Sequence, residues 1–126
     1  MLVGLPTAQA ADPTLTLACN GTTTAGYEGA KPEPLSMGII VNFTNRTVQG
    51  FGSPGVVDYP VKITAWNEVT VSFYGSDEKM GLRTRGAIDR VTGDVDATSM
   101  AYDPKNGKIV SQDVYALKCR PAQRMF

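Results

Sequence analysis

Histidine is absent from this chain of 126 residues, and other groups that build reactive sites are scarce. Without histidine the chain can form neither a Ser-His-Asp or Cys-His nucleophile system nor a histidine-containing zinc site. Two distant cysteines make a poor zinc site by themselves. A single tryptophan gives little sign of an aromatic-lined substrate cleft. We therefore expect no enzyme activity, no metal site and no cofactor.

A surplus of positive charge is also missing, since the chain has 12 basic and 12 acidic side chains. Nucleic-acid-binding proteins normally carry a basic surplus that displaces counterions, so we expect no nucleic-acid partner. No apolar run approaches the roughly 20 residues that a membrane helix needs. We expect a soluble protein with no membrane span.

Cysteine occurs only at Cys19 and Cys119, near the two ends of the chain, and a small-x-small cleavage pattern stands at Ala8-Gln9-Ala10. An export signal together with an even cysteine count indicates an oxidising compartment and one structural disulfide. We interpret residues 1–10 as the remnant of a signal peptide and residues 11–126 as a single domain. The predicted location is periplasmic or secreted.

Short β-strands separated by turn residues are predicted for the rest of the chain, because Gly, Pro, Asn and Asp interrupt it about every 8–12 residues. The spacing favours an all-β fold, an antiparallel meander of about eight strands that forms a small barrel. A disulfide between the first and last strands would close it, although a disulfide-linked sandwich fits as well. The predicted strands are Thr14–Cys19, Leu35–Phe43, Thr47–Phe51, Val61–Trp66, Val69–Tyr74, Gly81–Asp89, Asp94–Tyr102 and Lys108–Cys119.

One hairpin can be given a register from the sequence. A four-residue turn over Arg90–Gly93 sets Asp89 opposite Asp94. Leu82 and Ile88 then share a face with Val95, and the charged residues of the two strands fall on the other face, whereas a three-residue turn would mix the faces. The same register makes Arg85 and Asp96 diagonal neighbours that can form an exposed ion pair.

The inward face of this hairpin carries small residues, including Gly86, Ala97 and Ser99. Small residues on a barrel wall either leave a cavity for a ligand or make room for bulky neighbours, and close packing of interiors favours the second reading. The candidate ligand pocket consists of Trp66, Phe51, Phe73, Gly86, Ala97 and Ser99.

Two further patterns have simple interpretations. Gly50–Gly55 matches the letters G-x-G-x-x-G, but no helix-forming sequence follows, so we interpret it as a loop. Asp89, Asp94 and Asp96 share a hairpin face and could in principle serve glycoside hydrolysis or cation binding. A solvated face with local ion pairs explains them more simply.

Four short motifs stand out: Leu17-Ala18-Cys19-Asn20-Gly21, Ile88-Asp89-Arg90-Val91-Thr92-Gly93, Tyr115-Ala116-Leu117-Lys118-Cys119-Arg120-Pro121 and Arg124-Met125-Phe126. These motifs resemble those of small secreted alphaproteobacterial proteins of unknown function. The resemblance implies export, paired cysteines and a β-rich fold, but no activity. At the level of fold alone, the chain is also similar to periplasmic inhibitors of C-type lysozyme, whose inhibitory motifs it does not match.

These observations predict an exported, non-enzymatic binding protein. Its partner would be a small apolar ligand or a periplasmic protein. The alternative is an inhibitor of a cell-wall lytic enzyme such as lysozyme, acting through predicted loops at Thr22–Pro34 and Gly52–Pro60.

Overall fold

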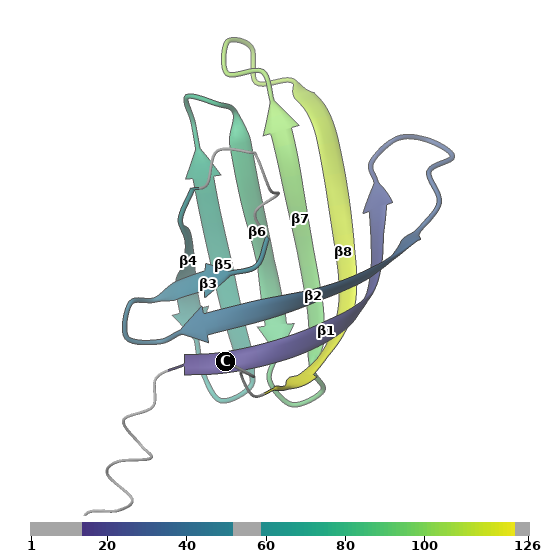
Figure 1. Cartoon of the computed structure of the whole chain (residues 1–126). Coiled ribbons are helices and arrows are strands. Elements are labelled where there is room, and N and C mark those ends of the chain that lie inside the picture. Colours follow the sequence, from purple (N-terminus) through teal and green to yellow (C-terminus); the bar gives the residue numbers. More distant parts are fainter. Residues whose placement is uncertain (1–13, 52–58, 123–126) are drawn as a thin grey trace, which may run out of the picture.

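The structure is a computed structural model that describes residues 14–51 and 59–122. Within these residues the chain forms a closed antiparallel barrel of eight strands (Figure 1). No helix long and apolar enough to cross a membrane occurs in this part of the chain. The strands are β1 (Thr14–Ala25), β2 (Glu33–Asn42), β3 (Thr47–Gln49), β4 (Val61–Trp66), β5 (Thr70–Asp77), β6 (Leu82–Asp89), β7 (Asp94–Tyr102) and β8 (Ile109–Pro121).

Each strand pairs with the next one along the chain, and β8 returns to pair with β1. Because hydrogen bonding continues around all eight strands, the fold is a barrel and not a sandwich. Cys19 lies directly opposite Cys119 in the β1–β8 register, and the two residues form a disulfide with 4.0 Å between their Cα atoms. The predicted all-β meander, closed by a bridge between its first and last strands, is confirmed.

The register predicted for β6 and β7 is also confirmed, since Ile88 pairs with Val95 and Gly86 with Ala97. The Gly93 amide donates to the Asp89 carbonyl oxygen at 2.9 Å, which closes the four-residue turn. Gly93 has φ of +84°, and a Cβ there would lie 2.3 Å from the Cys119 carbonyl oxygen. Glycine is therefore required by both conformation and space.

The predicted loop at Thr22–Pro34 is wrong at both of its ends. β1 continues to Ala25 and β2 already begins at Glu33, so the connection covers only 26–32. Thr22 and Thr23 are held in the sheet because they pair with β2 on one side and with β8 on the other. Of the other predicted loop, residues 52–58 lie outside the described part of the chain.

The barrel interior is filled by aliphatic side chains at one end and by aromatic rings in the middle. Ile39, Val41, Val71 and Val95 are fully buried. The Phe51 ring lies 5.2 Å from that of Phe73 and 5.5 Å from that of Tyr115, measured between ring centroids. These rings occupy the space that the small wall residues leave open.

The two ends of the barrel are defined by its turns. The lower end carries the β4–β5 and β6–β7 turns, residues 67–69 and 90–93, at the bottom of Figure 1. The β2–β3 turn, residues 43–46, projects at the left of the figure and belongs to the same end, because Arg90 contacts the Phe43 ring. The β5–β6 and β7–β8 connections lie at the upper end. β1 begins and β8 finishes near the lower end (Figure 1). The disulfide also lies toward that end, because the Cys119 amide donates to the carbonyl oxygen of Gly93 in the β6–β7 turn.

Candidate functional site

Four of the six predicted pocket residues come together inside the barrel. Phe51 and Phe73 stack there, and Gly86 and Ala97 form the adjacent wall. A Cβ at Gly86 would lie 2.6 Å from Cζ of Phe73. The small wall residues therefore accommodate the Phe73 ring, as close packing favours.

Ser99 belongs to a row of hydroxyl groups above these rings. Its Oγ lies 3.1 Å from Oγ1 of Thr84, which in turn hydrogen-bonds the Tyr59 hydroxyl group. Burial raises the pKa of Tyr115, and hydrogen bonding with Ser99 partly offsets this rise. Thr84 is a buried polar residue, with a relative exposure of 1%. Because buried hydroxyl groups need hydrogen-bond partners, this row explains how Thr84 can be buried.

Trp66 lies apart from the interior residues, at the lower end of the barrel. A bulge in β4 between Ile63 and Ala65 breaks the alternation of faces, and Trp66 remains 41% exposed. Its ring centroid lies 5.8 Å from that of Phe43, and the Arg46 guanidinium carbon lies 5.0 Å from it. Alternation from Val61 and Ile63, which are buried, places Trp66 on the outer face, so this pattern in the sequence could have indicated its exposure.

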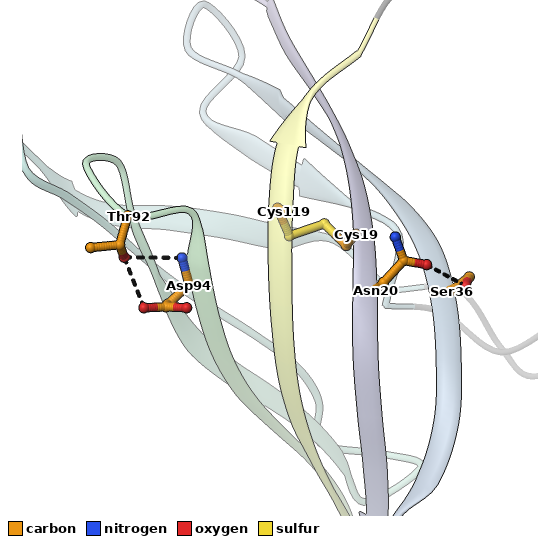
Figure 2. The surroundings of a disulfide bond; sticks show 6 residues. All are labelled: Cys19, Asn20, Ser36, Thr92, Asp94 and Cys119. Atoms are coloured by element: carbon orange, nitrogen blue, oxygen red, sulfur yellow. Dashed lines mark hydrogen bonds between the residues drawn. A yellow bond between two sulfur atoms is a disulfide. The ribbon is translucent and has the colours of Figure 1, made fainter.

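A pocket of about 420 Å³ opens at the lower end, and the sequence interpretation did not find it. Leu15, Leu17 and Ile88 supply its apolar side chains, and the β6–β7 turn forms one rim. Cys119 places the disulfide against the pocket, where it ties β8 to β1 (Figure 2). The lining residues are Leu15, Leu17, Ile88, Asp89, Arg90, Val91, Thr92, Gly93, Cys119, Arg120 and Pro121.

A second hollow of about 420 Å³ lies against the wall formed by β5 to β8. Its lining includes Arg85 and Asp96, the predicted ion pair. Although these residues are diagonal neighbours as expected, no ion pair joins them. Within residues 14–51 and 59–122 the ion pair that forms is Lys118–Asp94, at 3.0 Å.

Two of the three aspartates that could have served catalysis or cation binding, Asp89 and Asp94, are engaged at the β6–β7 turn, whereas Asp96 lies within β7 and lines the second hollow. The Asp89 carboxylate accepts hydrogen bonds from the Thr92 and Val91 amides, and these bonds lower its pKa. The pKa of Asp94 is lowered by Lys118 and by the Thr92 hydroxyl group, whose contact with Asp94 is visible in Figure 2. Among the described residues no cluster of three potential metal ligands occurs.

The lowered pKa of Asp89 makes the turn sensitive to acid. The ionised carboxylate is stabilised in the folded state, so its contribution is present above the unfolded pKa and is lost as the pH falls through the folded pKa. We expect NMR titration to give Asp89 a pKa below its ordinary value of 3.8. In Asp89→Asn, which keeps the acceptor oxygen but has no charge, the acid-dependent loss of stability should be smaller. Equal acid sensitivity in both proteins would contradict this assignment.

Comparison of the chain with known protein families, curated proteins and solved structures found no significant match. The resemblance to small secreted proteins of unknown function therefore stays a prediction, as does export. The geometry of the described residues is what bears on function.

Proposed function

We propose that this is an exported, non-enzymatic protein that binds a small apolar ligand in the lower-end pocket. The observation that carries the proposal is the combination of pocket size and lining. A volume of about 420 Å³ falls in the range of small-molecule sites, and such sites are mostly apolar with a few polar groups at fixed positions. Leu15, Leu17 and Ile88 supply the apolar part, and the backbone of the β6–β7 turn supplies polar groups.

The pocket is built on a constrained part of the fold, which favours binding. The Cys119 amide donates to the Gly93 carbonyl oxygen at 2.8 Å, so the β6–β7 turn is hydrogen-bonded to β8 beside the disulfide. A rim held by both covalent and hydrogen bonds loses little conformational freedom when a ligand enters. Export is consistent with the disulfide, because such bonds persist in oxidising compartments.

The state of the carboxylates supports a role without catalysis. A general acid at neutral pH needs a raised pKa, whereas those of Asp89 and Asp94 are lowered by the turn and by Lys118. Both side chains have structural partners that explain their position.

Native mass spectrometry of protein purified gently from the periplasm tests the proposal. We expect an additional mass in the native spectrum that disappears when the sample is denatured, and this mass would identify the ligand class. A bare polypeptide mass, together with no uptake of the fluorescent apolar probe N-phenyl-1-naphthylamine, would overturn ligand binding. Inhibition of a lysozyme by such ligand-free protein would favour the inhibitor alternative.

Filling the pocket should abolish binding without unfolding the barrel. Leu15 is half-buried and lines the pocket, so Leu15→Trp should place its ring there and reduce probe uptake about tenfold or more. Ile40→Trp is the matched control, because Ile40 lies between the inward-facing Ile39 and Val41 and points to the outer surface. Equal probe uptake by the two variants, both with wild-type circular dichroism, would place the ligand elsewhere.

A further inference from the structure

Three turns at the lower end are joined into one surface, which we call the turn surface. It consists of Phe43–Arg46, Trp66, Asn67–Val69 and Arg90–Gly93. The Arg90 amide donates to the Val69 carbonyl oxygen at 2.7 Å, and its Nη1 donates to the Asn67 carbonyl oxygen at 2.6 Å. The guanidinium carbon of Arg90 also lies 5.3 Å from the Phe43 ring centroid. Arg90 thus links all three turns.

Apolar side chains project into solvent from this surface. Val91 is 75% exposed and Val69 is 52% exposed, although both lie in turns that are normally polar. Trp66 adds an indole ring that is 41% exposed. An exposed cluster of this kind beside a structured rim indicates an interaction surface.

Cationic groups flank the apolar ones and retain free hydrogen-bond donors. Arg46 and Arg90 are held over the Trp66 and Phe43 rings, and no carboxylate pairs with either arginine in the described part of the chain. Glu68 is the one acidic residue in the three turns. The nearby Asp89 carboxylate is engaged by the amides of its own turn. The Arg46 guanidinium group and the donors of Arg90 other than Nη1 are therefore available to an external anion.

The backbone at Arg46 supports a role for its side chain. Arg46 is the one residue other than glycine with positive φ among those described, at 59°. Such a conformation is unfavourable for a residue with a Cβ, and glycine would adopt it freely. An arginine in this position, stacked on Trp66, points to a function that needs its charge.

We propose that the turn surface docks on an anionic phospholipid bilayer. Val69 and Val91 would enter the acyl–headgroup boundary, and Trp66 would lie at the headgroup level, where amphipathic rings are favoured. Arg46 and Arg90 would bind lipid phosphates, for which the guanidinium fork is well suited. The proposal does not depend on the pocket, although Arg90 and Val91 also border it and a ligand could then exchange directly with the bilayer.

The only tryptophan of the chain lies within the proposed surface, so its fluorescence reports on docking directly. The protein is mixed with phosphatidylglycerol vesicles and, separately, with phosphatidylcholine vesicles, and the samples are floated on a density gradient. We expect flotation with phosphatidylglycerol at low salt, a blue shift of the Trp66 emission and quenching by brominated lipid. Absence of flotation at low salt would overturn the proposal, as would flotation with an unchanged tryptophan spectrum.

Substitutions at the two ends of the barrel locate the contact. Val69→Glu should reduce vesicle binding by about tenfold or more, because a charge replaces an inserted apolar side chain. The matched control is Val110→Glu, since Val110 is 73% exposed but lies on β8 at the opposite end. Arg46→Gln should weaken the preference for phosphatidylglycerol, with Arg90 supplying what remains. Equal losses in Val69→Glu and Val110→Glu would exclude the turn surface.

Docking and ligand binding can be separated because Val69 does not line the pocket. Val69→Glu should keep its uptake of the apolar probe while losing vesicle binding. Leu15→Trp should keep vesicle binding while losing uptake of the apolar probe. If both variants lose both properties with wild-type melting temperatures, the docking surface and the pocket are not the separate features proposed.

Discussion

Removing the disulfide should lower the free energy of unfolding by about 4–5 kcal/mol in the chain-entropy account of cross-links. Cys19 and Cys119 are separated by 100 positions, so the bridge closes nearly the whole described chain into one loop. Without it the unfolded chain gains conformational freedom, while the β1–β8 hydrogen bonds alone must hold the barrel closed. The barrel depends on that seam because β1 and β8 are its first and last strands, and no turn of the chain connects them.

The measurement is denaturant unfolding of Cys19→Ala/Cys119→Ala beside the oxidised wild type. Reduced wild-type protein provides the control, since it loses the bridge while keeping both cysteine side chains. The double variant and the reduced wild type should both unfold at a much lower denaturant concentration than the oxidised protein. A reduced protein that melts within about a degree or two of the oxidised one would contradict the structural role, because 1 kcal/mol shifts the melting temperature of such a domain by more than that.

Phe73→Ala should destabilise the barrel by about 3–5 kcal/mol, the cost typical of removing a buried aromatic ring. The Phe73 side chain is 2% exposed and stacks on Phe51. Its partner across the wall is Gly86, which has no side chain to fill the space left by the ring. The cavity should therefore persist, and the loss should lie toward the upper end of that range.

Tyr74→Ala is the matched control for this prediction. Tyr74 is the next residue on β5, but its side chain points to the outer surface and is 38% exposed. Its removal should lower the free energy of unfolding by less than half as much as Phe73→Ala. Similar losses in the two variants would show that the Phe73 ring is not the central element of the core.

Local patterns in the sequence were sufficient to predict the order of the strands and the register between β6 and β7. The turn over Arg90–Gly93 separates apolar from polar residues in only one alignment, and the structure has that alignment. The two cysteines indicated which strands meet, since a disulfide brings its residues within a few ångströms. Both inferences rely on short-range chemistry or on a covalent link.

The ends of β1 and β2 and the location of the pocket depended on more distant contacts. Thr22–Ala25 have no apolar alternation, but neighbouring strands supply hydrogen-bond partners for this segment. The pocket forms where Leu15, Ile88 and Cys119 meet from three separate strands. Trp66 was grouped with the interior aromatics because aromatic residues on strands usually lie in the core, but it is the last residue of β4 and remains exposed at the lower end.

The sequence by itself determined the class of fold, the covalent closure and the lack of histidine chemistry, because these depend on residue identity and on alternation along single strands. The tertiary structure decided which side chains share a space. It showed that Gly86 accommodates Phe73 and that the chain has a pocket beside the disulfide. It also brought Arg46, Trp66 and Arg90 to one exposed end. Such groupings arise when the barrel closes, since closure brings together side chains from strands far apart in the chain.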